Sequence, residues 1–194
     1  MNKFSVNDPE TAERLAGMLN TPGTVLLLPT ETVYGLVARA GDMAALEKID
    51  RLKHRKAGKF FGWFIGNWQQ ISRYGLVGNA FADRLAERYF PGPLTLILAA
   101  STTSSQAVRI PDHPLLTALL DKIDAPLVQT SANLSGSPDA RSLEDALRQL
   151  DGEVDAAVDG GEIPLGSCGS TVVDTVNRKI LRQGSLVIEP ELMV

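Results

Sequence analysis

The chain has 194 residues, of which 44% are hydrophobic and 22% are charged, and its formal net charge is -4. This length and composition predict one folded domain over residues 1–194 and exclude a disordered chain. The acidic balance also argues against a protein that works mainly through non-specific nucleic-acid binding, which usually needs a basic surface.

The N-terminal part of the chain predicts two helices separated by a buried strand. No apolar run follows Lys3, so no secretory signal is expected. Asp8, which precedes a proline, predicts a helix N-cap, and the apolar run over 24–28 predicts a buried strand. Asp42 predicts the cap of a second helix. Because no apolar run is long enough to span a bilayer, we expect a cytoplasmic protein without membrane contact.

The middle of the chain predicts helices and strands in alternation. A short helix is expected over 68–74, and a longer one begins at Asn79 and ends at the rigid Pro91-Gly92-Pro93 turn. Strands are expected over 60–66, 95–100 and 106–110. The segment 101–105 is polar and predicts a loop.

The C-terminal part continues the same mixture. Asp112 predicts the cap of a leucine-rich helix, and Ser142 with Asp145 resembles a capping box for a helix that ends near Leu150. Strands are expected over 126–130, over 155–161, after Ser170, and over 179–184. Since helices and strands alternate imperfectly, the class is α/β with a mixed rather than a purely parallel sheet.

Several motifs of common enzyme classes are absent. The chain has no GxxxxGK[ST] phosphate loop, no GxGxxG after the first strand, no GxSxG, no HExxH and no CxxC. Its histidines, His54 and His113, are expected at the surface or at a cap, and its single cysteine, Cys168, is expected to be inert. A Ser-His-Asp hydrolase and a cysteine metal cluster are therefore not supported.

Polar side chains gather where the first predicted strand ends. They are the hydroxyls, carboxylate and phenol of Thr30, Glu31, Thr32 and Tyr34. Ligands of open α/β sheets bind at strand ends, so these residues predict a binding segment. The alternative is a polar turn with Gly35 at a tight bend.

A cationic run follows the second predicted helix. It consists of Lys53, Arg55, Lys56 and Lys59. Clustered cations beside a flexible glycine suit a triphosphate, because they neutralise charge that grows on the phosphates in the transition state. The alternative is a solvated helix end. Arg55 is expected there for its charge and not for burial, so Arg55→Ala should remove activity and leave the fold intact.

Arg109 lies between two apolar residues of a predicted strand. If Val108 and Ile110 face the core, Arg109 faces the opposite side of the sheet. An arginine in that position usually pairs with a carboxylate or a phosphate, and the alternative is an internal salt bridge.

Small polar residues and glycines gather over 130–136 and over 166–174. Their backbone N–H groups and short side chains suit the wrapping of an anion or a purine edge. Plain turns are the alternative. Arg182 follows in the last predicted strand, two residues before a glycine.

Taken in order, these segments resemble the YrdC/Sua5 family, the threonylcarbamoyl-AMP synthases. The similarity covers residues 29–184 and is carried by PTETVYGL, KxR, PGPLT, VRIPDHP, TSANLSG, DGG, STVVD and RxG. It implies a twisted open mixed sheet with flanking helices and a large concave basic cleft. The length is that of the short, YrdC-like form.

The resemblance also implies a chemistry. It implies a nucleotidyltransferase that makes threonylcarbamoyl-AMP and pyrophosphate from L-threonine, bicarbonate and ATP. The product would serve N6-threonylcarbamoyladenosine formation at position 37 of tRNA, with downstream threonylcarbamoyl-transfer proteins and with contact to tRNA or double-stranded RNA. Mg²⁺ is expected with ATP, bound mainly by phosphate and water, and no metal site built from protein ligands is expected.

Residue roles follow from the same resemblance. The L-threonine subsite would consist of Thr32, Arg109 and Ser170. The ATP subsite would consist of Lys53, Arg55, Lys59, Ser131, Asn133 and Arg182, with Lys53 and Arg55 as the catalytic residues. Catalysis would then rest on positioning and charge neutralisation, which needs no histidine base.

Two positions depart from the family pattern, and both are expected beside the substrate pocket. Phe64 stands where Sua5-type members have a histidine, and Gln129 stands where a small residue is usual. The basic loop also lacks the proline expected after Arg55. These departures leave two alternatives: a YciO- or HypF-like relative with the same nucleotide site and a different acceptor, or a non-catalytic RNA-binding module.

Overall fold

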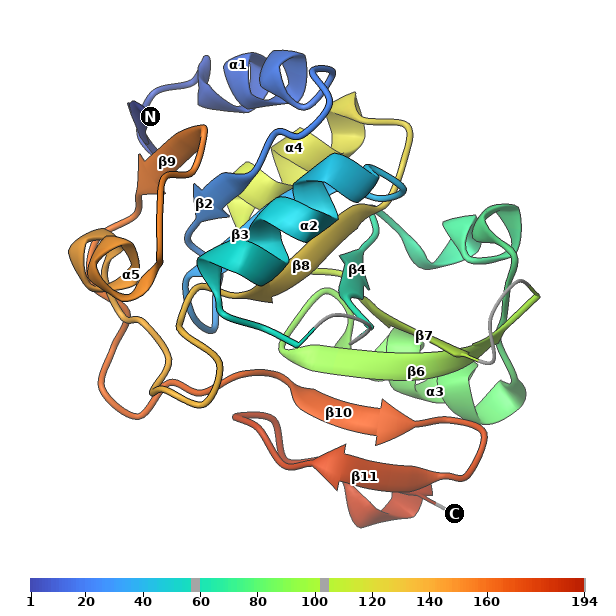
Figure 1. The fold of residues 1–194 in the computed structure, drawn as a ribbon. Helices are drawn as coiled ribbons and strands as arrows, with labels where there is room; N and C mark the ends of the chain where they lie inside the picture. The colour runs from blue at the N-terminus through green and yellow to red at the C-terminus, as the bar shows by residue number, and fades with distance from the viewer. Residues whose placement is uncertain (57–59, 102–104, 194) are drawn as a thin grey trace.

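The computed structural model describes residues 1–56, 60–101 and 105–193. These residues form one eleven-stranded sheet with helices on both faces (Figure 1). The strands follow the order β1-β9-β2-β3-β8-β4-β7-β6-β10-β11, and β5 pairs with β6. Parallel pairs such as β2 with β9 stand beside antiparallel pairs such as β3 with β8, and the sheet does not close on itself. The expected open, mixed α/β sheet is confirmed.

The strands are short. They are β1 (Asn2–Ser5), β2 (Leu26–Leu28), β3 (Gly35–Arg39), β4 (Gly62–Phe64), β5 (Leu76–Val77), β6 (Leu94–Ala100), β7 (Ser105–Arg109), β8 (Leu127–Ser131), β9 (Ala156–Asp159), β10 (Thr171–Asp174) and β11 (Lys179–Arg182). The helices are α1 (Thr11–Met18), α2 (Met43–Leu52), α3 (Ala80–Tyr89), α4 (Pro114–Lys122) and α5 (Leu143–Gln149). Three short 3-10 helices cover Trp68–Gln70, Ser72–Tyr74 and Pro190–Met193.

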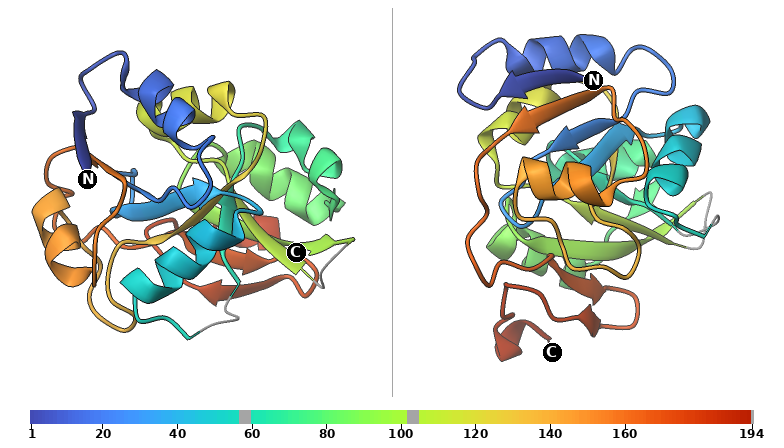
Figure 2. Two further views of the ribbon diagram at one scale, coloured as in Figure 1. Left: turned by 45° about the horizontal axis from the view of Figure 1, so that its top comes forward. Right: turned by 60° about the vertical axis from the view of Figure 1, so that its left-hand side comes forward.

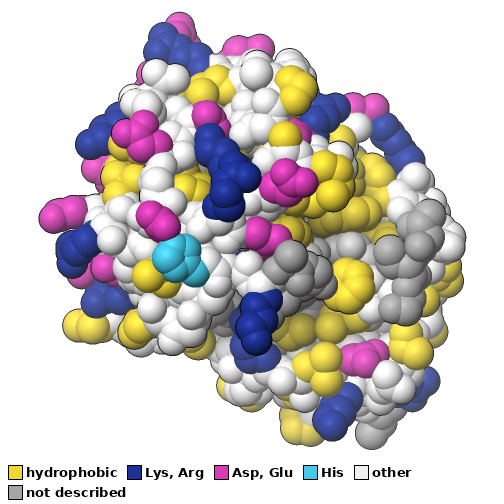
Figure 3. Space-filling model, in the orientation of Figure 1, with side chains coloured by type: hydrophobic (Ala, Val, Ile, Leu, Met, Phe, Trp, Pro, Cys, Tyr) yellow, Lys and Arg dark blue, Asp and Glu magenta, His cyan; other side chains and the backbone are white. Residues whose placement is uncertain are grey.

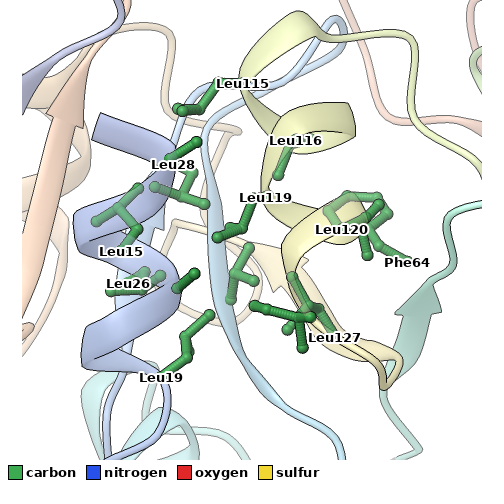
Figure 4. Packing of buried hydrophobic residues seen from close by; sticks show 14 of the residues in the cluster. Leu15, Leu19, Leu26, Leu28, Phe64, Leu115, Leu116, Leu119, Leu120 and Leu127 are labelled. Carbon is green, nitrogen blue, oxygen red and sulfur yellow. The ribbon is translucent and has the colours of Figure 1, made fainter. Parts of the chain in front are cut away.

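Helices α1 and α4 cover one face of the sheet (Figure 4). Leu15 of α1 faces Leu116 and Leu119 of α4, and β2 and β8 contribute further leucines to the same cluster. Leu15, Leu116 and Leu119 are fully buried. Each such side chain stabilises the fold by roughly 1.5–3 kcal/mol relative to exposure.

Helices α2 and α5 lie on the other side of β2 and β3 from α1 and α4 (Figure 2). Helices α2 and α5 pack over residues such as Leu27 and Leu36, and α3 packs over Val108 and Leu96. The leucines of β2 are all buried because side chains on both faces of this strand meet a helix layer. This explains the continuous apolar run over 24–28.

Side chains cap three helices as predicted. Asp42 accepts a hydrogen bond from Ala45 N, and Asn79 accepts one from Ala82 N. Ser142 accepts one from Asp145 N, but the Asp145 carboxylate takes its bond from the neighbouring Arg141 N, so the capping box is incomplete.

Two predicted caps are wrong. Helix α1 begins at Thr11, and Asp8 accepts instead from Glu10 N in the preceding turn. Helix α4 follows His113 without a side-chain cap, and the Asp112 backbone N–H donates to Glu31. In both segments the aspartate precedes the N-cap residue, which is Glu10 in α1 and His113 in α4.

Strands β1, β3 and β5 were not predicted. Gly35 does not form a tight bend but begins β3, where it pairs with Ser131 of β8. The register explains the glycine, because a Cβ there would lie 3.3 Å from Thr130 O of the neighbouring strand. The polar segment before β3 therefore connects β3 to the adjacent strand β2.

Candidate functional site

A cavity of about 240 Å³ opens beside the α1 and α4 layer. Gly35, Gly62 and Gln129 line it, and each lies two residues along its strand from a member of the α1 and α4 core cluster. Side chains two residues apart share a face of a sheet, so the cavity lies on the same face as those helices. Val108 and Ile110 pack on the opposite face. The prediction that Arg109 points away from its apolar neighbours is confirmed.

Ionisable side chains of opposite sign line this cavity. Within the described ranges they are Arg55, Arg109, Arg182 and Asp139. The lining also includes the hydroxyl residues Thr30, Thr32, Thr95, Thr130, Ser131 and Ser170. Three cations with one carboxylate suit a ligand that carries several negative charges.

Arg109 forms one corner of the cavity. Its side chain is 4% exposed, and its Nη2 lies 2.5 Å from Glu31 Oε1. Nη1 donates to Thr32 Oγ1 at 3.2 Å, and Nε donates to Gly92 O at 3.2 Å. The internal salt bridge that the sequence left open is thus present, and it holds the guanidinium plane toward the cavity.

The Glu31 carboxylate stabilises the buried positive charge of Arg109. Burial lowers the pKa of Arg109, and the Glu31 carboxylate opposes that effect. Glu31 Oε1 also accepts from Asp112 N, so the carboxylate joins the segment before β3 to the segment after β7. Oε2 of Glu31 is buried and has no hydrogen-bond partner among the described residues.

Ser170 and Arg182 form the wall on the β10 side. Ser170 Oγ shares a hydrogen bond of 2.6 Å with Thr95 Oγ1, and Arg182 donates to Ser170 O through Nε and Nη2. Gly184 lets β11 reach this wall, because a Cβ there would collide with Gly169 O. Arg182 and Gly184, which the sequence analysis noted together, therefore both contribute to this wall of the cavity.

Lys53 lies behind the cavity wall rather than in it. It is 4% exposed, and its Nζ donates to Ser131 O, to Asn133 O at 2.6 Å and to Asn133 Oδ1 at 3.3 Å. An ammonium group has three N–H donors, so each has a partner here. Lys53 therefore ties the end of α2 to the segment 131–133.

Asn133 is held by the same network. Ser131 Oγ donates to Asn133 Oδ1 at 2.5 Å, and Asn133 Nδ2 donates to Ser137 O at 2.6 Å. Ser131 lines the cavity, whereas Asn133 is buried beside it. The small polar motif is thus a fixed turn that presents Ser131.

Arg55 lines the cavity, but it was wrongly expected to be unburied. Its side chain is 10% exposed, its Cζ lies 4.1 Å from the centre of the Phe61 ring, and Nη2 donates to Phe60 O at 2.8 Å. Burial lowers the pKa of Arg55, and Asp50 opposes that effect. Nη1 is buried and has no hydrogen-bond partner in the described part of the chain. Removing this side chain should therefore cost stability as well as charge.

The cavity brings together most of the predicted site residues. They are Thr32, Arg55, Arg109, Ser131, Ser170 and Arg182. Lys53 and Asn133 support the wall from behind, and Lys59 lies outside the described residues. Asp139 was missed, and its position three residues after the TSANLSG motif was the available signal. Glu31 was noted, but its pairing with Arg109 was not foreseen.

The two departures from the family pattern lie in different places. Gln129 lines the cavity, as expected. Phe64 does not: it is 1% exposed and packs in the core near Leu120 (Figure 4). Its ring lies 5.8 Å from the Arg109 Cζ, so it lies behind the guanidinium. Phe64 therefore affects the site through Arg109.

Other candidates lie away from the cavity. Tyr34 is buried on the opposite face, where its hydroxyl donates to Gly161 O at 2.8 Å and accepts from Gly160 N at 3.0 Å. Burial raises its pKa. His54 contacts Asp151 at the surface, and Cys168 is exposed. His113 occupies the N-cap position of α4 without capping it, and burial lowers its pKa.

The described ranges hold no group of three or more His, Cys, Asp or Glu side chains that could bind a metal ion. Within the same ranges, every helix is too short or too polar to cross a membrane. The face drawn in Figure 3 carries basic and acidic side chains interspersed with one another. This face does not present the single-sign surface that phosphate-backbone binding favours.

Comparison with known proteins identifies relatives along most of the chain. The sequence model of the Sua5_yciO_yrdC family, described as "Telomere recombination", matches residues 19–184. The threonylcarbamoyl-AMP synthase of Bacillus subtilis is 34% identical over 200 residues, which cover 97% of this chain and 57% of that protein. The chain thus spans little more than half the length of that relative.

Two solved structures are similar in fold and sequence. Sua5 of Pyrococcus abyssi, solved as a complex with L-threonine, has a TM-score of 0.85 and 31% identity, covering 95% of this chain and 57% of that chain. YciO of E. coli has a TM-score of 0.82 and 26% identity, covering 97% of this chain and 96% of that chain.

Proposed function

The chain belongs to the Sua5/YciO/YrdC family, and from this premise we propose that it is an L-threonylcarbamoyladenylate synthase. It would convert L-threonine, bicarbonate and ATP to threonylcarbamoyl-AMP, pyrophosphate and water. The reaction would make it a nucleotidyltransferase. The observation that carries the proposal is the cavity in which Arg109 and Thr32 form one corner and Arg55 and Arg182 contribute further cations.

The cavity chemistry supports a reaction that needs positioning. In the proposed sequence, bicarbonate takes up a proton and loses water to give CO2. The threonine amine then adds to CO2 and loses a proton, which gives a carbamate. A carbamate oxygen then attacks the α-phosphorus, the bond from the α-phosphorus to the bridging oxygen breaks, and pyrophosphate leaves. None of these steps needs a covalent nucleophile from the protein. Fixed guanidinium groups would neutralise the charge that moves onto the leaving phosphates.

Each predicted site residue has a proposed role. Arg109 would bind the amino-acid carboxylate, with Thr32 and Ser170 closing that subsite. Arg55 and Arg182 would bind the nucleotide beside Ser131. Lys53 and Asn133 would support the nucleotide subsite through the fixed turn they share with Ser131, and Lys59 would add charge at the triphosphate.

Mg²⁺ would enter with ATP and would neutralise charge on its phosphates. The lining contains Asp139 as its carboxylate within the described ranges, which fits an ion held mainly by phosphate and water. A single carboxylate does not make a metal site in the absence of the nucleotide. The proposal therefore includes magnesium as part of the substrate.

The proposed setting is the cytoplasm, where the adenylate would pass to threonylcarbamoyl-transfer proteins that modify tRNA. Direct contact with tRNA or double-stranded RNA is a further proposal. The mixture of charges on the face in Figure 3 does not favour a large RNA surface there. The catalytic proposal is preferred to an RNA-binding module because it accounts for the cations that line the cavity.

The decisive experiment measures pyrophosphate release from ATP with Mg²⁺. We expect release only when L-threonine and bicarbonate are both present, because the carbamate is the attacking group. Omission of either substrate is the internal control. Release with another amino acid but not with threonine would instead favour a YciO-like relative with a different acceptor. The similarity to E. coli YciO over nearly its full length is the reason to test this alternative. No release with any acceptor would refute the enzyme proposal.

Nucleotide affinity is expected to fall above pH 8. Burial, followed by the charge of Arg55, lowers the pKa of Lys53 from 10.5 to about 8, and Asp139 opposes the shift. The neutral amine has one donor fewer, so one contact to the segment 131–133 is lost. We expect the KM for ATP to rise above pH 8 in the wild type but not in Lys53→Arg, whose charge persists. A pH profile common to both proteins would contradict this role.

Deprotonation of Lys53 is expected to weaken nucleotide binding, but its effect on the stability of the fold has the opposite direction. Because the folded-state pKa of Lys53 lies below its ordinary 10.5, the folded chain loses this proton first as pH rises. Between these two values the unfolded chain binds more protons, so this group makes the fold more stable as pH increases through that window. Urea unfolding at pH 7.5 and 9.5 separates the two effects.

A further inference from the structure

Gln129, Gly62 and Ala107 form one part of the cavity lining, which we call the floor. Gln129 of β8 stands directly opposite Gly62 of β4 in the strand register. A Cβ on Gly62 would lie 2.6 Å from Gln129 Nε2, so the carboxamide rests over the glycine. Ala107 of β7 also lines the cavity and adds little bulk. The Gln129 side chain therefore occupies the space that the missing side chain of Gly62 leaves.

The Gln129 side chain lines the cavity, where a ligand could reach its carboxamide. It is half-buried, and no residue of the described ranges forms a hydrogen bond with it. Gln106 of β7 provides a contrast, because its amide donates to Phe61 O at 2.8 Å and to Ala107 O at 3.0 Å. A carboxamide offers two donors and an acceptor. Gln129 thus presents unused hydrogen-bonding capacity to the cavity.

Gln129 lies on the same face of the sheet as Ser131 and Arg109. It precedes Ser131 by two residues on β8, and Ala107 precedes Arg109 by two residues on β7, so these side chains share one face. In the proposed function, an α-amino acid would bind there with its carboxylate at Arg109 and its amine toward the nucleotide. The side chain of this amino acid would then face either the opening of the cavity or the Gln129 carboxamide.

We propose that Gln129 determines which amino acid this cavity accepts, by hydrogen bonding a short polar side chain and by leaving no depth for a longer one. This inference rests on the proposed synthase function and names its acceptor class. Threonine and serine fit such a floor. Valine matches threonine in shape but lacks the hydroxyl, and leucine is longer.

Four variants test the inference. We would measure kcat/KM for threonine, serine, valine and leucine in wild type, Gln129→Ala, Gln129→Met and Gly62→Ala, with Gln69→Ala as an exposed glutamine control. Gln129→Ala should reduce the threonine-to-valine preference by about tenfold and raise the relative use of leucine by a similar factor. Gln129→Met keeps the bulk, so it should lose only the preference for threonine over valine.

The glycine variant provides an independent check, because it moves the carboxamide without removing it. The atom that a Cβ at Gly62 would meet is the end of a flexible side chain, so the fold should persist. Gly62→Ala should also reduce the threonine-to-valine preference, and it should have no further effect on this ratio in a Gln129→Ala background. Urea midpoints would confirm that each variant is folded.

Amino-acid binding measured by calorimetry, with a non-hydrolysable ATP analogue present, separates this inference from the proposed reaction. Acceptor ratios that stay unchanged in both Gln129 variants would overturn it. So would a change in ATP-to-GTP preference without a change among amino acids, which would assign the carboxamide to the nucleotide. If wild type binds amino acids with the expected dependence on Gln129 but releases no pyrophosphate, the reaction is wrong and this inference stands. If wild type binds no amino acid, both are overturned.

Discussion

Arg109→Ala is expected to lower the free energy of unfolding by about 3–5 kcal/mol, because it leaves Glu31 as a buried carboxylate without its cation. The two side chains are 4% and 17% exposed, and they lie 2.5 Å apart. The variant also removes the bonds to Thr32 and Gly92 that shape the corner. Urea unfolding followed by tryptophan fluorescence measures the change.

Two controls separate this effect from the loss of an ordinary ion pair. Arg88 and Glu189 form a pair of similar length whose side chains are 59% and 48% exposed, so Arg88→Ala should cost less than about 1 kcal/mol. The double variant Glu31→Gln/Arg109→Met should be more stable than Arg109→Ala, since it leaves no unpaired charge. Equal costs for the buried and the exposed arginine would show that the pair does not hold the corner.

Arg109→Lys distinguishes ligand binding from stability in the same corner. Lysine keeps a positive charge beside Glu31 but cannot reproduce the planar fork of arginine. We expect the KM for the amino acid to rise by about 10–100-fold with a smaller change in kcat. An unchanged KM would remove Arg109 from the amino-acid subsite.

Arg55→Ala is expected to lower the kcat for pyrophosphate release by about 1000-fold, because a fixed guanidinium beside the leaving phosphates is lost. A stability cost of about 1–2 kcal/mol should accompany this, since the side chain is 10% exposed and stacks on Phe61. Assays must therefore be made well below the unfolding transition. Arg51→Ala, which changes an exposed arginine in the last turn of α2, is the matched control.

Comparison of the change in unfolding free energy with the change in kcat for Arg55→Ala decides the role of Arg55. A variant that unfolds more easily but keeps its turnover would show that Arg55 supports the loop after α2 and does not serve the phosphates. Arg55→Lys should recover part of the rate, because it restores charge without the fork. Recovery of stability alone would point to the same structural role.

Local signals predicted much of the fold. The helices α2, α3 and α5 begin after the residues that the sequence proposed as caps, because a side-chain oxygen next to a helix start acts within one turn. The alternation around Arg109 correctly placed its side chain opposite the core. Strand β3 was missed because the polar segment before it resembles a turn, and its pairing with β2 and β8 becomes visible only in the tertiary structure.

The order of the motifs along the chain was enough to indicate the family, and the resemblance to that family gave Arg55, Arg109 and Arg182 their expected ligand roles. Contacts between distant segments decided what each of them does. Lys53 faces its partners 78 and 80 residues away, Arg109 faces Glu31, and Phe64 lies in the core while Gln129 lies on the cavity floor. Sequence patterns report spacing and face within one element, whereas burial and pairing arise only when elements pack, so the partners of these charges became visible in the tertiary structure alone.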